Sequence, residues 1–511
     1  MEANERRSAF EASLSKSGGL WLLVLSFAFS IILRVPLLFQ HPFTFVDEAW
    51  VASISKVLVE GGTLYQDVWS NKQPLLLFFS ELLFQVFGLH MEALHLGTLF
   101  LVFLVSTLLF CIGSSFFSPG VGGGAALTYA LLSTTYYTPR IIGTTTETLM
   151  LVFTCAAIYC FLQGKVNARV YGFFAAGLLS FLAVISKPAA VTLIALFFIL
   201  LLPRRSQPKE LHLKSLTLLG AGYLCGLSLL VLYLADAGSL ELWWYQSLIS
   251  RVDYVSQITL PDFLSKLIRQ PFSFGLITSW IWLLSWGGRQ GKEQNRIAYW
   301  VILSWLVSAF VGVSMGRRFY ANYFIQMFPA MSLLAAVGVT HLWQMPRKRL
   351  NKIFLYTSGV LFLLPFLWFQ ARVLVHWYFF VDPQAHSQIQ LWGMCVGNRE
   401  VVEASNYIRS RTQSGDSIFV WGPKPELYFL SGRDMATLYP VYDVADNGEP
   451  PFDTSIDLET VEVLRKARPR YIIDVMRNIH LEDFAPWRNL VEEAYDFQTQ
   501  MHEMRFYRLR D

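Results

Sequence analysis

Long apolar runs separated by short polar segments make up most of the first three quarters of this 511-residue chain. A window of about 19 residues, which detects membrane-crossing helices, predicts about eleven spans. They lie near residues 20–40, 92–113, 121–138, 146–163, 170–186, 188–202, 215–235, 272–288, 297–315, 320–344 and 353–374. Helices satisfy their own backbone hydrogen bonds inside lipid, so this pattern predicts an α-helical, multi-pass membrane protein.

The polar segments between these runs predict the orientation of the chain. Cytoplasmic loops carry an excess of lysine and arginine. With a cytoplasmic N-terminus, four inner loops are basic, and they contain Lys165 and Arg169; Arg204, Arg205, Lys209 and Lys214; Arg289, Lys292 and Arg296; and Arg347, Lys348, Arg349 and Lys352. An odd number of spans then places the C-terminal segment outside, and we expect the protein in the cell (inner) membrane.

The first outer loop, about 41–91, is predicted to contain two short helices. Apolar residues from Ala49 to Leu58 recur at helical spacing, and Gly61 interrupts the pattern. A second run begins at Pro74 and ends at Phe87. Each is about 13–15 residues long, too short to cross a bilayer comfortably. We therefore expect two helices that lie in the outer membrane interface.

Beyond residue 395 the composition becomes that of a soluble domain. The pattern predicts an amphipathic helix around 401–408, strands at Ser417–Trp421 and Tyr471–Val475, a helix around 457–467 and a closing strand from Met504 to Arg510. The chain thus divides into a transmembrane domain, 1–395, and a small extracytoplasmic α/β domain, 396–511. The latter has no GxGxxG, P-loop or GxSxG motif, so we expect it to supply no chemistry of its own.

Composition narrows the possible functions. The chain is 54% hydrophobic and only 15% charged, and its mean hydropathy is +0.41. A net charge of +4, spread over small groups, argues against a nucleic-acid partner. The cysteines show no zinc-type spacing with each other or with histidine. Candidate chemistry must therefore come from the few charged residues on the outer side.

Asp47 and Glu48 follow the first span directly. Paired carboxylates at a helix start often only complement the helix dipole, and Thr44-x-x-Asp47 fits a capping box. The alternative is a general base, because an acceptor hydroxyl needs a positioned carboxylate to take its proton.

Lys72 and Glu147 offer a similar choice. Lys72 precedes the second interfacial helix, where it either extends to the headgroups or faces a phosphate together with the helix N-terminus. Glu147 opens the fourth span, where Thr144-x-x-Glu147 also fits a capping box. A carboxylate in an apolar span is costly unless it faces a polar cavity, which favours a functional role.

Basic and tyrosine residues gather before the tenth span. Arg317, Arg318, Tyr320 and Tyr323 lie in Gly-Arg-Arg-Phe-Tyr-Ala-Asn-Tyr, on the side where the orientation bias predicts few cations. Guanidinium groups and tyrosine hydroxyls suit a phosphate. Arg251 and Lys266 in the preceding outer loop are either solvated charges or further phosphate ligands.

These motifs, taken in order, resemble bacterial membrane glycosyltransferases of the family 39 type. They are Val46-Asp47-Glu48-Ala49, Gly61-Gly62-x-x-Tyr65-x-Asp67, Lys72-Gln73-Pro74-Leu75, Glu147, the Gly316–Tyr323 segment and Pro329. That group is related to protein O-mannosyltransferases and to the aminoarabinose transferase of lipid A. The resemblance implies the type C glycosyltransferase fold, an external active site and a polyprenyl-phosphate-linked sugar donor, with inversion at the anomeric carbon.

The resemblance also implies roles for individual residues. Asp47 matches the catalytic aspartate, Glu48 and Glu147 match acidic positions of the acceptor or sugar site, and Lys72 with the Arg317–Tyr323 segment matches donor-phosphate contacts. Asn71 stands where some relatives have a metal-binding carboxylate, so no obligatory cofactor is expected, although a divalent metal stays possible. The acceptor is a lipid, a glycan or a protein, and membrane lipids are further partners.

Two other functions stay open at this point. A secondary transporter or lipid-linked-sugar flippase would place ionisable residues near the membrane midplane in two matching halves. Here the charges gather on one face, and we see no internal repeat. A non-catalytic assembly factor would instead depend on the C-terminal domain as a docking surface and not on Asp47.

Overall fold

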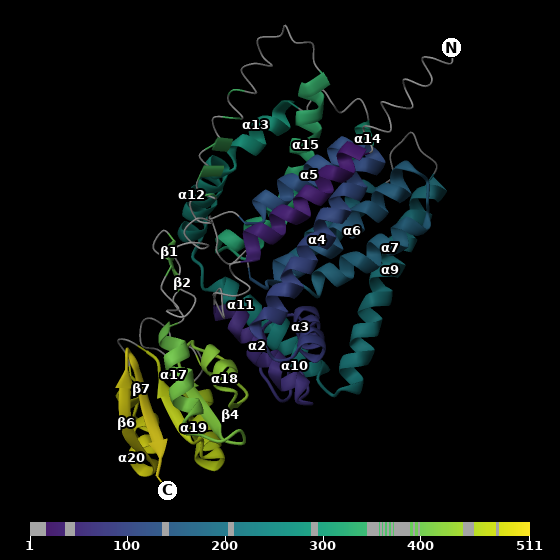
Figure 1. The fold of residues 1–511 in the computed structure, drawn as a ribbon. Coiled ribbons are helices and arrows are strands. Elements are labelled where there is room, and N and C mark those ends of the chain that lie inside the picture. The colour runs from purple at the N-terminus through teal and green to yellow at the C-terminus, as the bar shows by residue number, and fades with distance from the viewer. Residues whose placement is uncertain are drawn as a thin grey trace, which may run out of the picture.

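The computed structural model describes residues 17–35, 46–134, 143–202, 209–287, 295–344, 389–391, 394–396, 399–442, 454–476 and 480–510, with isolated residues between 357 and 371. Helices form the larger part of the molecule, and a small sheet domain lies at one end of it (Figure 1). The expected architecture, a polytopic helical domain followed by an α/β domain, is confirmed.

Within the described residues, six helices are long and apolar enough to cross a membrane. They are Ser17–Val35, α4 (Met91–Phe116), α6 (Thr146–Val166), His212–Asp236 within α9 (Lys209–Asp236), α14 (Arg296–Met315) and Ala321–His341, which joins η5 (Ala321–Met327) to α15 (Phe328–Gln344). Shorter apolar helices accompany them, among them α5 (Pro119–Leu132), α7 (Tyr171–Val184), η2 (Pro188–Ala190), α8 (Val191–Leu200) and α13 (Ser279–Gly287). The count of eleven stays a prediction, and the span expected near 353–374 lies largely outside the described residues.

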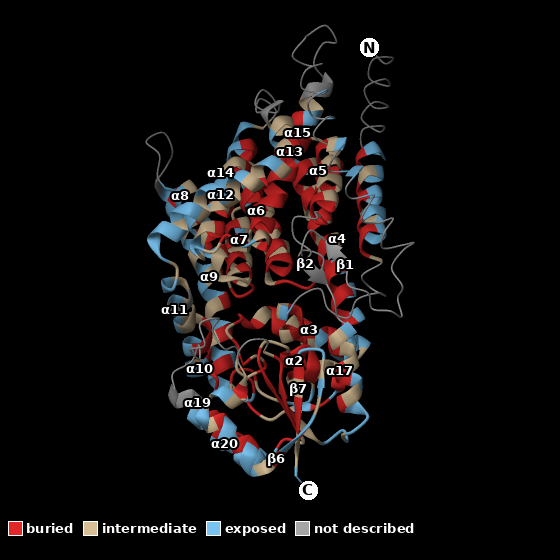
Figure 2. Ribbon diagram, turned by 90° about the vertical axis from the view of Figure 1, so that its left-hand side faces the viewer, coloured by how far each residue is buried: buried red, intermediate tan, exposed pale blue. Residues whose placement is uncertain are grey.

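Burial divides the helical domain into an apolar interior and an apolar exterior. Buried residues concentrate where the helices face one another (Figure 2). The outer faces also carry large apolar side chains; on α9, Leu224, Leu229 and Leu232 are each more than half exposed. Large exposed apolar side chains on the outer faces suit contact with lipid, which is consistent with a membrane protein.

The two helices expected in the first outer loop are present. They are α2 (Val46–Val59) and α3 (Pro74–Phe87). The intervening loop 63–73 is held by hydrogen bonds: the Tyr65 hydroxyl donates to the Lys72 carbonyl at 2.8 Å, and Gln246 bonds both the Ser70 N–H and the Tyr65 carbonyl. The backbone of Lys72 is thereby fixed at the start of α3.

The C-terminal domain is a five-stranded sheet with helices on both faces. Its strands are β3 (Ser417–Trp421), β4 (Asp434–Met435), β5 (Tyr471–Asp474), β6 (Tyr495–Met501) and β7 (Met504–Leu509), in the order β4-β3-β5-β7-β6. Alternate residues of β3 enter two cores: Phe419 and Trp421 pack toward α19 (Thr454–Ala467) and α20 (Ala485–Ala494), whereas Ile418 and Val420 pack toward α17 (Arg399–Arg409) and α18 (Glu426–Ser431). The elements expected here are confirmed; the boundary at 395/396 stays a prediction.

This domain contacts the first outer loop directly. Figure 1 places it beside α2 at one end of the helical domain. The Ser53 hydroxyl donates to the Pro425 carbonyl at 3.0 Å, and Lys56 pairs with Asp434 at 2.8 Å. The C-terminal domain therefore lies against the segment that contains three of the sequence-predicted site residues, Asp47, Glu48 and Lys72.

Candidate active site

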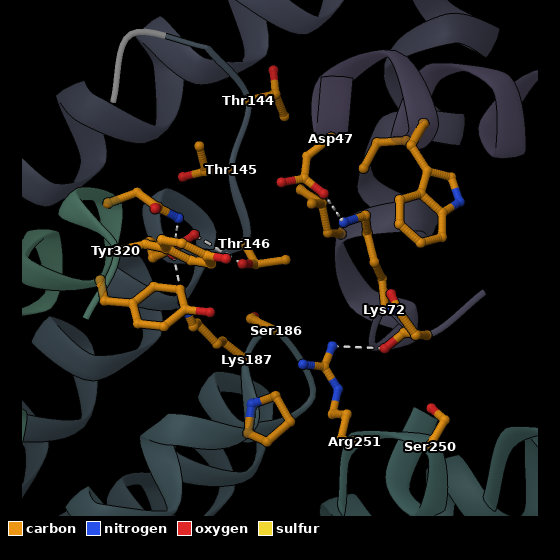
Figure 3. A pocket seen from close by; sticks show the side chains of 18 residues that line it. Asp47, Lys72, Thr144, Thr145, Thr146, Ser186, Lys187, Ser250, Arg251 and Tyr320 are labelled. Atoms are coloured by element: carbon orange, nitrogen blue, oxygen red, sulfur yellow. Dashed lines mark hydrogen bonds and ion pairs between the residues drawn. The ribbon is translucent and has the colours of Figure 1, made fainter. Parts of the chain in front are cut away.

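A polar cavity of about 240 Å³ lies where the first outer loop meets the helical domain. It is lined by residues from six separate parts of the chain: Asp47, Trp50, Val51, Asn71, Lys72, Leu76, Thr144, Thr145, Thr146, Glu147, Ser186, Lys187, Pro188, Ser250, Arg251, Tyr320, Asn322 and Tyr323. Three cations and two carboxylates are among these described lining residues. Figure 3 shows the labelled side chains arranged around this space.

Asp47 and Lys72 form one side of the cavity. Lys72 Nζ lies 2.7 Å from Asp47 Oδ1 and 4.6 Å from the centroid of the Trp50 ring (Figure 3). Asp47 is in the first turn of α2, and its side chain is 46% exposed. Its carboxylate can therefore still meet a molecule that enters the cavity.

Glu147 forms the opposite side, together with its neighbour Thr146 and groups from two other segments. Its Oε1 pairs with Lys187 Nζ and accepts from Asn322 Nδ2 at 2.7 Å, and its Oε2 accepts from the Thr146 hydroxyl at 2.9 Å. The Lys187 ammonium also lies 4.0 Å from the centroid of the Tyr323 ring. The Glu147 side chain is only 3% exposed, so this carboxylate contacts protein partners and little solvent.

The capping role considered for Glu147 is wrong. Helix α6 begins at Thr146, and its N-cap is Thr145, whose side chain accepts from the Thr148 N–H. A capping box would therefore need an acidic residue at position 148, where the chain has threonine. The Glu147 carboxylate is left to pair with Lys187 instead.

Arg251 supplies the third cation. It lies beside the π-helix η3 (Tyr245–Ile249), in α11 (Ser250–Ser256), and its Nη2 donates to the Asn71 carbonyl at 2.6 Å. This bond ties Arg251 to the residue before Lys72. Figure 3 shows its guanidinium directed into the cavity between Lys72 and Lys187.

The segment Gly316–Tyr323, which leads into η5, contributes its tyrosines to the cavity but not its two arginines. Tyr320 and Tyr323 line the cavity, with ring centroids 5.6 Å apart. Arg318 Nη2 instead donates to Gln257 at 2.9 Å, and Arg317 lies beside the Phe263 ring. Arg317 and Phe319 adopt left-handed backbone conformations, with φ of 54° and 51°. This turn directs successive side chains differently from a regular helix.

Glu48 is buried away from the cavity. Its Oε1 accepts from the Thr144 N–H at 2.7 Å, and His95 Nε2 lies 3.3 Å from the same oxygen. Glu48 is fully buried and thus joins the start of α2 to α4 and to the turn that carries Thr145 and Glu147. This placement indicates a positioning role and does not bring Glu48 to an acceptor or sugar in the cavity.

Lys187 was missed by the sequence analysis. It lies between two short apolar runs, 170–186 and 188–202, and the predicted orientation places their junction outside. A lysine at an outer junction runs against the distribution expected from the positive-inside rule, and this departure marks Lys187 as a candidate site residue. Lys266, the other cation considered in this region, does not line the cavity.

The donor set does not favour a divalent metal. No group of three His, Cys, Asp or Glu side chains with metal-binding geometry occurs among the residues described. The two carboxylates of the cavity are each paired with a lysine, which leaves little negative charge for a hard cation. The absence of an obligatory metal stays a prediction.

The profile of the dolichyl-phosphate-mannose-protein mannosyltransferase family matches residues 71–233, which include Lys72, Glu147 and Lys187. Over these residues the chain is similar to that family. The resemblance drawn from the motifs is thereby confirmed. No curated protein matches the chain by sequence.

Solved structures extend the similarity to the whole fold. ArnT from Cupriavidus metallidurans, solved with undecaprenyl phosphate, aligns with a TM-score of 0.61 at 13% identity, over 95% of this chain and 97% of that one. The archaeal oligosaccharyltransferase AglB from Archaeoglobus fulgidus, solved with an inhibitory peptide and a dolichol-phosphate, aligns with a TM-score of 0.50 at 12% identity, over 94% and 71%. At these identities the comparison establishes the fold, which is that of type C glycosyltransferases.

Proposed function

We propose that this protein is a glycosyltransferase that transfers a sugar from a polyprenyl-phosphate donor to a lipid, glycan or protein acceptor at the outer face of the cell membrane. The observation that carries the proposal is the cavity itself. It holds an accessible carboxylate, Asp47, together with three cations and two tyrosines. The family match and the fold shared with ArnT, whose structure contains undecaprenyl phosphate, favour the same class of reaction.

The proposed reaction is a single displacement with inversion. The acceptor hydroxyl oxygen attacks the anomeric carbon, and the bond from that carbon to the phosphate oxygen breaks, leaving its electron pair on the lipid phosphate. Asp47 takes the hydroxyl proton as attack proceeds. Glu147 is less suited to this step because its carboxylate is buried and already accepts from three partners.

The cations supply the second requirement, which is stabilisation of the leaving group. Negative charge grows on the phosphate as its bond to the sugar breaks, and preorganised cations lower the energy of that state. Lys72, Lys187 and Arg251 line the same cavity as Asp47, so a phosphate bound between them leaves its sugar beside the base. A phosphate leaving group needs no proton donor. One accessible carboxylate, Asp47, is therefore enough for the reaction.

A transporter or flippase would also bind a lipid phosphate, but it differs from a glycosyltransferase in what happens to the donor. Transport moves the donor without changing it, whereas transfer consumes the sugar–phosphate bond. A strain lacking the protein should lose one sugar modification from its envelope glycans, glycolipids or glycoproteins, as measured by mass spectrometry. Uptake of a lipid-linked sugar into proteoliposomes without chemical conversion would support transport instead.

The decisive variant is Asp47→Asn in the complemented strain. Loss of a general base lowers turnover by at least ~10²-fold, so the modification should stay absent while the variant accumulates normally in the membrane. The conservative control is Asn71→Gln. Asn71 lines the cavity, but its one assigned contact is made by its backbone carbonyl, which accepts from Arg251. Near-normal modification by Asp47→Asn would contradict the proposed role of this residue.

A further inference from the structure

A row of aromatic rings connects the active-site lysine to the C-terminal domain. The Lys72 ammonium lies over the Trp50 ring. Trp50 stacks on Trp69, with ring centroids 6.0 Å apart and planes 13° apart. Trp69 in turn lies 6.2 Å from the ring of Tyr439, which belongs to the segment that follows β4.

A backbone hydrogen bond reinforces the same contact. The Trp69 N–H donates to the Leu438 carbonyl at 2.8 Å, so the loop 63–73 and the C-terminal domain are joined at the base of the aromatic row. The other anchors of this loop, made by Tyr65 and Gln246, hold its backbone. The position of the ammonium itself is set by its contacts with Asp47 and Trp50.

We propose that Trp69 and Tyr439 are positioning residues, through which the C-terminal domain holds the Lys72 ammonium in place to bind the donor phosphate. The identity of that ligand rests on the function proposed above. Tyr439 fixes the Trp69 ring, Trp69 supports Trp50, and Trp50 confines the ammonium beside Asp47. The C-terminal domain thereby takes part in the active site although none of its described residues lines the cavity.

The physical reason is the flexibility of lysine. Its four-carbon stem has many rotamers, and confining it before the ligand arrives removes part of the entropy cost of binding. The ring face of tryptophan attracts the ammonium and holds it without occupying its hydrogen-bond donors. An ammonium held in this way keeps donors for a phosphate.

The test measures the binding of undecaprenyl phosphate to the purified full-length protein by titration calorimetry in detergent. Trp69→Ala and Tyr439→Ala should each weaken the affinity about 3- to 10-fold, the range expected when a cation–π support is lost. Tyr439→Phe keeps the ring and should restore wild-type affinity. Wild-type affinity in both alanine variants would overturn the proposal.

Asp434→Asn is the matched control. It removes the ion pair with Lys56 in the same domain contact but leaves every member of the aromatic row in place. Asp434 is 54% exposed and Lys56 keeps Glu60 as a partner at 3.1 Å, so we expect wild-type affinity. If Asp434→Asn weakens binding as much as Trp69→Ala, the effect comes from general domain docking, and the aromatic row has no specific role.

A double-mutant cycle separates positioning from folding. In a Lys72→Ala background, Trp69→Ala should cause no further loss of affinity, because the group that it positions is gone. Additive losses would overturn the proposal. Failure of the wild-type protein to bind undecaprenyl phosphate would instead contradict the proposed function, so the two failures are distinguishable.

Discussion

Lys72 Nζ lies 2.7 Å from Asp47 Oδ1, so the group expected to hold the donor phosphate is paired with the group expected to act as base. An incoming phosphate can use the donors that Lys72 keeps, but its negative charge competes with the Asp47 carboxylate for the same ammonium. As the phosphate draws the Lys72 ammonium toward itself, its ion pair with the Asp47 carboxylate weakens, and that carboxylate can accept a proton from the acceptor. Donor binding thus prepares the base, because both roles meet at one ammonium.

This competition predicts that Asp47→Asn separates binding from transfer. Removing the negative charge leaves Lys72 available to a phosphate, so the affinity for undecaprenyl phosphate should be equal to or higher than that of the wild-type protein. Sugar transfer should nevertheless fall by at least ~10²-fold. Titration calorimetry and envelope mass spectrometry measure the two effects separately. A parallel loss of binding would show that Asp47 holds the donor.

Arg251 and Arg318 can be compared directly, because both are arginines but only Arg251 lines the cavity. Arg251 lines the cavity, whereas Arg318 bonds Gln257 outside it. A charge-assisted hydrogen bond contributes about 1.5–3 kcal/mol, so Arg251→Ala should weaken undecaprenyl phosphate binding by about 10-fold or more. Arg318→Ala should change it less than threefold. The reverse order would restore Arg318 to the phosphate site that the family resemblance implies.

The Glu147–Lys187 pair should behave as a buried ion pair. Removing one partner leaves an uncompensated buried charge, which costs about 3–5 kcal/mol. Glu147→Gln and Lys187→Met should therefore each lower Tm in detergent, and the double variant should recover most of that loss.

The same double variant also tests Lys187 as a phosphate ligand. Because it still lacks one lining cation, it should bind undecaprenyl phosphate more weakly than the wild-type protein, even with Tm restored. Binding at wild-type affinity would reduce Lys187 to a structural partner of Glu147.

Glu48 allows its two assigned roles to be distinguished. As a positioning residue, it satisfies the Thr144 N–H inside the protein. Glu48→Ala leaves this buried donor unpaired, at a cost of about 1–3 kcal/mol, and should lower Tm. Glu48→Gln keeps an acceptor oxygen and should retain most of the stability and the sugar transfer. If Glu48→Gln kept its Tm but lost transfer, the acceptor-site role would be favoured.

Glu426 predicts a pH dependence of the C-terminal domain. It lies in the first turn of α18, where its Oε2 is buried without a hydrogen-bond partner among the described residues. Burial raises the pKa of Glu426 to about 7 from an ordinary value of 4.5, although the positive charge of Lys424 opposes the shift. The folded state therefore holds this proton more tightly than the unfolded chain.

Stability should accordingly fall as pH rises from about 4.5 through about 7, by about 3 kcal/mol at most. Glu426→Gln cannot ionise and should raise Tm at pH 8 more than at pH 5. Thermal unfolding of the full-length protein, followed by tryptophan fluorescence, measures this difference. An equal effect at both pH values would contradict the assignment.

The sequence predicted elements whose pattern is local. Strand β3 is a continuous apolar run, and α17 alternates polar and apolar residues at helical spacing, so both were found. The docking of α18 on α2 could not be predicted, because it joins segments far apart in the chain through contacts such as Ser53 with Pro425.

In the candidate site, too, local patterns were predictable from the sequence and the backbone conformation was not. Asp47, Lys72 and Glu147 were found because each is a charge beside an apolar run, and all three line the cavity. Arg317 and Arg318 were expected at the phosphate because they run against the orientation bias and match the family motif, but left-handed backbone at 317 and 319 directs the chain differently. No feature of the residue types at these positions predicts that conformation.

The two helices that flank Lys187 are short, and this sets the depth of the reaction. Helix α7 has 14 residues and rises about 21 Å, whereas the hydrocarbon core is about 30 Å thick. The apolar helix Pro188–Leu200 is shorter than α7. Unless the bilayer thins around them, helices of this length span only part of that thickness, so we expect the turn that carries Lys187 to lie below the headgroups. A lipid phosphate that reaches this ammonium would then be drawn inward along its own chain, and the acceptor would have to descend to meet it.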